Sequence, residues 1–209
     1  KTVDIRGSVL GENFSRFRLE YGAGTMPSNW ITIVDSPTSP SSDLLGSLDT
    51  TTLPDGYYAI RLSATNIANK TVATSARLIF DNSAPAISLT APVNGTVLGG
   101  KINLDGAVTD NNLKNYKVEY SPDSVNWNLI KTGAVPVANS TITVWDTTGL
   151  NGAYTIRITA QDAAGNASVY PLSLSVDNVV SDTSAAITNP AYGMVIANIV
   201  EVIGLANDT

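Results

Sequence analysis

The side chains of this chain that could do chemistry are mostly oxygen donors. Aspartate and asparagine recur in short stretches rich in glycine, serine and alanine, and six of them are candidate ligands of a cation: Asp55, Asp81, Asn82, Asp110, Asn111 and Asp162. Calcium takes about six to eight oxygens, from carboxylates and amides alike. The same residue types are common in turns, because they hydrogen-bond to the nearby backbone and tolerate left-handed geometry. These positions therefore have two interpretations, a calcium site or ordinary turns.

Catalytic side chains are scarce. The chain has no histidine and no cysteine, so it lacks the usual general base, the commonest metal ligand, and any thiolate site or disulfide. We find no nucleophile elbow, phosphate-binding loop or metal-ligand motif. The sequence predicts a protein that is not an enzyme and needs no cofactor, calcium excepted.

The charge balance excludes two classes of partner. The chain carries 12 Lys and Arg against 18 Asp and Glu, a net charge of −6. Nucleic-acid binding needs a basic surface, and an anionic membrane surface attracts one too. No apolar run approaches the roughly 20 residues of a membrane span. We therefore expect no nucleic-acid partner and no membrane insertion.

The chain repeats itself. Residues 116–120 (YKVEY) match residues 17–21 (FRLEY), and residues 154–158 (YTIRI) match residues 58–62 (YAIRL), with a shift of about 96–99 residues. A duplicated module usually serves reach, rigidity or multivalent contact, whereas a catalytic site is normally built once.

The hydropathy pattern within each repeat has a period of two. Along residues 17–21, for example, apolar side chains alternate with Arg18 and Glu20. Such alternation predicts strands with one face in a core and one face in water. Turn signals such as Asp55-Gly56 and Asn151-Gly152 separate the apolar runs. About seven short strands in each repeat predict an all-β fold of tandem two-sheet sandwiches.

The repeat also predicts the domain boundaries. Module one covers residues 1–83 and lacks its opening strand, module two covers residues 84–180, and residues 181–209 copy the opening strands of module two. One interpretation is a fragment of a longer tandem array. The other is that these ends are native, so that the C-terminal strands complete module one of the next subunit in a filament.

Two stretches carry a family resemblance. Residues 116–127 (YKVEYSPDSVNW) resemble the third-strand region of a fibronectin type III or bacterial Ig-like domain, and residues 150–166 resemble the sixth strand and the hairpin after it. Residues 102–108 lack the tryptophan that is usual in fibronectin type III, so the likeness is greater to Ig-like repeats of bacterial and archaeal secreted or surface proteins. The resemblance implies that Tyr58 and Tyr154 are corner tyrosines, whose hydroxyls bond back to the backbone.

The linker between the modules carries a second resemblance. Residues 81–85 (DNSAP) resemble the acidic linker of cadherins, where calcium stiffens tandem sandwiches. In a sandwich, the loop of Asp55 lies at the end of module one. The loops of residues 110–112 and 162–166 lie at the start of module two. The six candidate ligands would then gather at this junction. At the second junction Asn151 replaces Asp55, which weakens the case there.

The tryptophans offer one more candidate site. An exposed aromatic platform could stack on sugar rings, but Trp30 and Trp127 occupy equivalent positions in the repeat, which favours packing. Trp145 has Leu48 at its matching position, so it is the better candidate for a ligand contact.

These observations predict a non-catalytic structural or adhesive repeat region, a spacer or stalk outside the cell or on its surface. Its partners would be neighbouring modules of the same array, other subunits or surface glycans. Two alternatives stay open: a carbohydrate-binding accessory region of a secreted enzyme, and a filament subunit completed by strand exchange.

Overall fold

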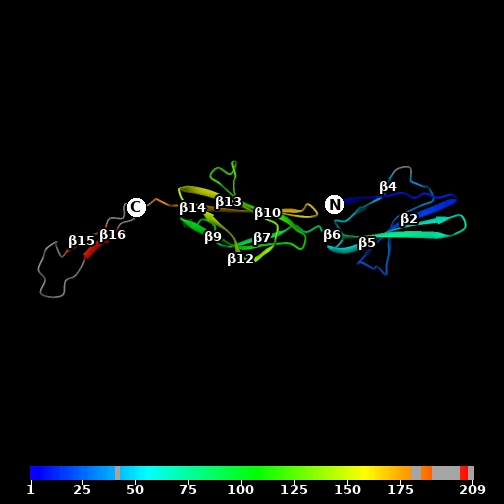
Figure 1. Ribbon diagram of the computed structural model, residues 1–209, viewed down its shortest axis with the longest axis horizontal. Coiled ribbons are helices and arrows are strands. Elements are labelled where there is room, and N and C mark those ends of the chain that lie inside the picture. Colours follow the sequence, from blue (N-terminus) through cyan, green and yellow to red (C-terminus); the bar gives the residue numbers. More distant parts are fainter. Residues whose placement is uncertain (41–42, 180–184, 190–202, 207–209) are drawn as a thin grey trace.

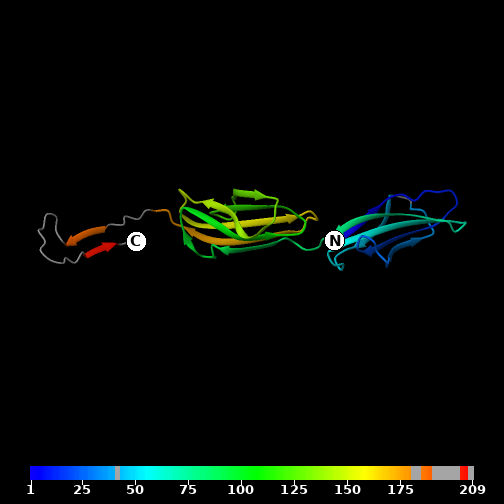
Figure 2. The ribbon, with the colours of Figure 1, turned by 60° about the horizontal axis from the view of Figure 1, so that its bottom comes forward.

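The computed structural model describes residues 1–40, 43–179, 185–189 and 203–206, and its regular structure there is entirely β-strand. Two modules lie end to end along the long axis, and the N-terminus lies beside the junction between them (Figures 1 and 2). Among the described residues no helix is long and apolar enough to cross a membrane. The all-β prediction is confirmed.

Module one contains six strands. They are β1 (Thr2–Arg6), β2 (Phe14–Ala23), β3 (Ile31–Ser36), β4 (Leu44–Asp49), β5 (Gly56–Asn66) and β6 (Thr71–Phe80). Four form an antiparallel sheet in the order β3-β2-β5-β6, and β1 pairs with β4 in a second sheet. The alternating pattern turns Phe17 and Leu19 of β2 inward, where they pack with Leu45 and Ile60 in the core.

Module two contains eight strands. They are β7 (Ala86–Ala91), β8 (Val97–Leu98), β9 (Lys101–Thr109), β10 (Leu113–Ser121), β11 (Asn128–Gly133), β12 (Val137–Asp146), β13 (Gly152–Asp162) and β14 (Ala167–Val176). One sheet has the order β11-β10-β13-β14-β8, with β8 parallel to β14, and the other has the order β12-β9-β7. The core between the sheets is centred on fully buried side chains, including Leu104, Val118, Ile142 and Ile158.

The sequence repeat appears as a structural repeat. In module one Leu19 of β2 pairs with Leu62 of β5, and in module two Val118 of β10 pairs with Ile158 of β13. Strands β1–β6 thus correspond to β9–β14, while β7 and β8 have no counterpart among the described residues of module one. Beyond module two, β15 (Ala185–Asn189) pairs antiparallel with β16 (Ile203–Ala206). The other residues predicted to begin a third module lie outside the described residues.

The two tyrosines predicted to form corners differ. The Tyr58 hydroxyl donates a hydrogen bond to the Pro54 carbonyl at 3.0 Å, as predicted. No such bond is made by Tyr154 within the described part of the chain; its ring instead packs edge-on against Trp145, with ring centroids 5.9 Å apart. The corner bond is therefore a feature of module one.

Candidate metal site at the module junction

Three aspartates from the two modules meet at the junction because of where their strands end. Asp81 directly follows β6, the last strand of module one, while Asp110 follows β9 and Asp162 ends β13. Strands β9 and β13 run toward the end of module two that faces module one. The three side chains thus come from points of the sequence far apart and converge on one place.

The carboxylates are close together. One oxygen from each of Asp81, Asp110 and Asp162 lies within 4.8 Å of the others. Asp162 is fully buried and the other two are half-buried. At about 5 Å and an effective dielectric of about 20, each pair of negative charges repels by about 3 kcal/mol. Among the described residues no lysine or arginine forms an ion pair with any of the three.

Two asparagines hold the carboxylates in place across the junction. Asn112 Nδ2 donates to Asp81 Oδ2 at 2.6 Å. Asn166 Nδ2 donates to the carbonyls of Asp81 and Ser83, both at 3.0 Å, and to Asp162 Oδ2 at 2.6 Å. The Lys1 ammonium adds a further link, donating to the Ala164 carbonyl at 2.6 Å. Because each carboxylate oxygen has more than one lone pair, these bonds leave room for a cation.

Two of the three carboxylates, those of Asp81 and Asp110, line an open cleft, while Asp162 is buried behind them. A cleft of about 410 Å³ at the junction is lined by residues of both modules, among them Asp55, Asp81, Asp110 and Asn111. The donor atoms are oxygens only, with no nitrogen or sulfur ligand. Hard divalent cations prefer this chemistry, and the flexible coordination of calcium suits oxygens that loops present. The residues present therefore fit calcium.

The structure divides the six candidate ligands into two groups. Asp81, Asp110 and Asp162 come together, and Asn111 lines the same cleft. Asp55 lines this cleft too, but its carboxylate braces the linker: it accepts hydrogen bonds from the Ser83 hydroxyl at 2.5 Å and the Asn82 backbone N–H at 2.7 Å. The same bonds, that of the Ser83 hydroxyl first, lower the pKa of Asp55.

The Asn82 side chain is hydrogen-bonded within module one. Its Nδ2 donates to the carbonyls of Thr50 at 2.9 Å and Leu53 at 3.2 Å, within module one. Asn178 repeats this arrangement in module two, donating to the carbonyls of Thr147 and Leu150. Because the arrangement recurs, we interpret Asn82 as a residue that ties the end of module one to the rest of that module. The side chains of Asn112 and Asn166 also bridge the junction, but through their amide nitrogens, whereas the sequence predicted them as oxygen donors to calcium.

At the second junction the Asn178 backbone N–H donates to Asn151 Oδ1 at 2.8 Å, as the Asn82 N–H does to Asp55. The residues that follow, 180–184, lie outside the described part of the chain.

Trp145 lies in the core. It is 2% exposed and packs against Tyr120, with ring centroids 5.2 Å apart. Its indole N–H has no hydrogen-bond partner among the described residues. A ring so placed does not meet a ligand at the surface, so the prediction of a ligand contact at Trp145 is not carried further. Its lack of an aromatic match in module one reflects a larger core in module two.

The other two tryptophans form a repeated surface cluster. Arg61 stacks over Trp30 at 4.1 Å and pairs with Glu20, and Arg157 stacks over Trp127 at 3.8 Å. Arg157 pairs with Glu119 in the same way. Each arginine covers one face of its tryptophan ring. These clusters fix side chains on the sheet surface.

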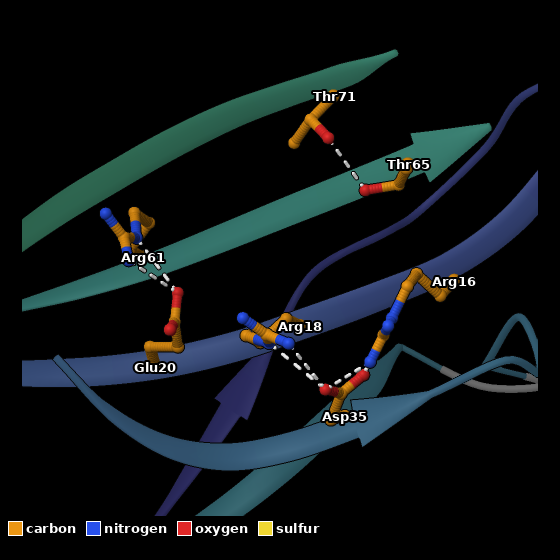
Figure 3. A network of polar contacts seen from close by, with 7 residues as sticks. All are labelled: Arg16, Arg18, Glu20, Asp35, Arg61, Thr65 and Thr71. Carbon is orange, nitrogen blue, oxygen red and sulfur yellow. Dashed lines mark hydrogen bonds and ion pairs between the residues drawn. The ribbon is translucent and has the colours of Figure 1, made fainter. Parts of the chain in front are cut away.

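Module one alone adds a second ion-pair group beside this cluster. Asp35 of β3 accepts hydrogen bonds from Arg16 at 3.0 Å and from Arg18 at 2.9 Å, and the Thr65 and Thr71 hydroxyls are bonded nearby (Figure 3). The hydrogen bonds from Arg16 and then Arg18 lower the pKa of Asp35. Each arginine in Figure 3 thus has a carboxylate partner within the protein.

Comparison with known proteins gives no family. No family model and no curated protein matches the chain. Among solved structures, a tetra-tandem repeat in the extending region of a large adhesion protein is 24% identical, with a TM-score of 0.39, over 85% of this chain and 44% of that one. A bacterial ice-binding adhesin structure is 20% identical, with a TM-score of 0.35, over 90% of this chain and 62% of that one.

Extracellular cadherin domains 3–6 of protocadherin gamma B2 are 11% identical, with a TM-score of 0.28, over 84% of this chain and 45% of that one. The chain thus spans less than two thirds of each of these structures. With TM-scores below 0.5, these likenesses carry no argument about function.

Proposed function

We propose that this chain is a non-catalytic spacer of tandem β-sandwiches from the outside or the surface of a cell, and that calcium bound by Asp81, Asp110 and Asp162 stiffens its junction. The observation that carries the proposal is the convergence of three carboxylates from two modules, one of them fully buried. Without a cation their mutual repulsion works against the straight junction. With one, the same charges hold the modules together.

Each side chain has a part in this mechanism. Asp81 belongs to module one, whereas Asp110 and Asp162 belong to module two, so an ion shared by all three resists bending between the modules. Asn166 orients Asp162 and holds the linker carbonyls, and Asn112 orients Asp81. Asp55 holds the linker backbone on the module one side through Asn82 and Ser83. The bound ion supplies positive charge and a centre of coordination.

The calcium affinity expected of such a site suits a location outside the cell. Extracellular modules bind calcium with a Kd of about 10⁻⁴–10⁻³ M, where the ion is abundant. A carbohydrate-binding accessory role would need exposed coplanar rings, and no observation on Trp30, Trp127 or Trp145 favours it.

Isothermal titration calorimetry of the 209-residue chain with calcium chloride tests the site. We expect binding near one ion per chain, weakened at least tenfold in D81N and in D110N, because each removes one charged ligand. The matched control is D43N, which makes the same change at an exposed surface position. Absence of calcium binding, or equal binding in all variants, would contradict the proposal.

A further inference from the structure

The outer face of the larger sheet of module one carries a polar hollow. It has a volume of about 540 Å³ and lies over β2, β5 and β6. The guanidinium groups of Arg16 and Arg18 on β2 line one side of it. The other side is lined by short side chains of β5 and β6, which are Ser63, Thr65, Thr71 and Ala73.

The hollow forms because long and short side chains lie next to one another on one face of the sheet. Arg18 lies opposite Ser63, and Ser63 lies opposite Ala73, so this row across the strands passes from a long side chain to two short ones. In the next row Arg16 lies opposite Thr65 (Figure 3). Residues directly opposite one another in paired strands share a face. The hollow is thus bordered by guanidinium groups on one side and by hydroxyl groups on the other.

Positive charge is in excess beside these hydroxyls. Arg16 and Arg18 share a single carboxylate, that of Asp35 (Figure 3). Lys70 lies in the hairpin that borders the hollow and forms no ion pair with any described residue. Three cationic side chains thus gather around one carboxylate, in a chain whose net charge is −6.

The arginines also keep free hydrogen-bond donors. A guanidinium group has five N–H donors. Arg16 and Arg18 use Nε and Nη2 toward Asp35, and the third arginine that lines the hollow, Arg61, uses the same two atoms toward Glu20. Within the described part of the chain, Nη1 of these arginines makes no hydrogen bond. The side chains are partly exposed, so these donors are open to a ligand.

Module two forms its sandwich without this arrangement. In the same register, Asn115 and Lys117 stand in place of the two arginines of β2. Thr132 stands in place of Asp35. Exposed ion pairs contribute little to stability, and the core of module two is the larger of the two without them. The arginine group of module one is therefore not explained by a need of the fold.

The hollow does not depend on the extra strand that this sheet has in module two. β8 pairs with Ser175 and Val176 of β14, which match Ile79 and Phe80 at the end of β6. The hollow lies over residues 71–73, at the beginning of β6. A strand in the position of β8 would therefore leave the hollow uncovered.

We propose that this hollow binds a sugar that carries a carboxylate group, such as a uronic acid of a glycan. A planar carboxylate accepts two parallel N–H bonds from a guanidinium group, and Arg16 and Arg18 have donors to give. The hydroxyl groups on the other side, together with the Asn69 amide, match the hydroxyl groups of a sugar ring. The volume of the hollow is also that of a small-molecule site.

The lining favours a sugar over other acidic partners. Its one apolar residue is Ala73, whereas the buried centre of a protein interface is rich in apolar and aromatic side chains. Single-stranded nucleic acid needs exposed rings on which its bases stack, and Trp30 lies outside the lining with one face covered by Arg61. The net charge of −6 disfavours a long polyanion. Recognition rests on charge and hydroxyl groups, and it does not depend on the calcium junction.

Saturation-transfer difference NMR of the 209-residue chain with sodium glucuronate, in the presence of EDTA, tests the site. We expect transfer to glucuronate but not to glucose, its neutral match. R16Q and R18Q should each weaken binding at least tenfold, because each removes a guanidinium group. R77Q is the matched control, since it removes an exposed arginine of β6 that does not line the hollow. Equal transfer to glucose, or unchanged binding in R16Q and R18Q, would overturn the proposal.

Competition separates the sugar from other carboxylates. Sodium acetate has the charge without the ring and should displace glucuronate at least tenfold less well than glucuronate displaces itself. Poly-L-glutamate should also be the weaker competitor per carboxylate. Equal displacement by acetate would show a site for simple anions, and better displacement by poly-L-glutamate would show a site for an acidic protein segment; either result contradicts the sugar. Circular dichroism of each variant checks that it is folded.

Discussion

The two modules share one alternating sequence pattern, but their core side chains are buried to different extents. In module two β9 has a neighbouring strand on each side, and Leu104, Ile142, Ile156 and Ile158 are fully buried. In module one the matching β1 edge is open, and Ile5, the counterpart of Leu104, is only half-buried. The difference shows that burial of a strand depends on its neighbours across the fold as well as on its own alternation.

The features that the modules share are local. The arginine–tryptophan stack occurs in both, at Arg61 and Arg157. The asparagine that closes each module, Asn82 or Asn178, occurs in both as well. Among the described residues, the features that differ are long-range: the edge strands β7 and β8 beside module two, and the larger aromatic core around Trp145. The modules thus share their local side-chain contacts and differ in the strands at the sheet edges.

The largest difference should come from the core. L104A removes a fully buried side chain and should lower the free energy of unfolding of module two by about 3–4 kcal/mol. I5A, at the matching half-buried position, should cost module one about 1–2 kcal/mol. Urea unfolding followed by tryptophan fluorescence measures both, since each module has its own tryptophans. Equal losses would show that the open edge does not reduce the contribution of β1.

A smaller difference should separate the two tyrosines. Y58F removes the hydroxyl that bonds to Pro54 and should cost about 1 kcal/mol. Y154F removes a hydroxyl with no such bond among the described residues and should be close to neutral. Thermal unfolding of the two variants against the natural chain makes the comparison. A larger loss of stability in Y154F than in Y58F would contradict the assignment of the corner bond to Tyr58.

The smallest effect should be the pH dependence of the Asp35 ion pairs, which module two lacks because Thr132 stands there. The pKa of Asp35 is lower in the folded chain than in the unfolded one, through Arg16 first and Arg18 next. Its contribution to stability is therefore present above the unfolded pKa of about 4 and is lost as the pH falls below it.

The difference in melting temperature between the natural chain and D35N should accordingly shrink between about pH 5 and pH 3. A difference that stays constant in acid would contradict the ion-pair account of this position.

The sequence predicted the fold well because its signals are local. Apolar and polar residues alternate along residues 17–21 and 116–120 because a strand has one buried and one exposed face. The same alternation in both modules made the prediction of strands stronger. The sequence predicted the junction only in part. Asp81 could be placed there because it lies in the linker, and Asp110 and Asp162 because their loops lie at the start of module two. Whether Asn82 turns toward the cleft or back to Thr50 depends on side-chain packing, which spacing does not encode.

The burial of Trp145 escaped prediction for the same reason. Trp145 stands alone in the alignment of the modules, and nothing in its neighbours along the chain distinguishes a buried ring from an exposed one.

The calcium-stiffened junction is tested most directly by small-angle scattering of the chain, first with calcium and then with EDTA. We predict a larger maximum dimension and a narrower distribution of distances with calcium. The change should be lost in D110N and kept in D43N. An identical profile in calcium and EDTA would contradict the account, because carboxylates that bind no ion cannot stiffen the junction.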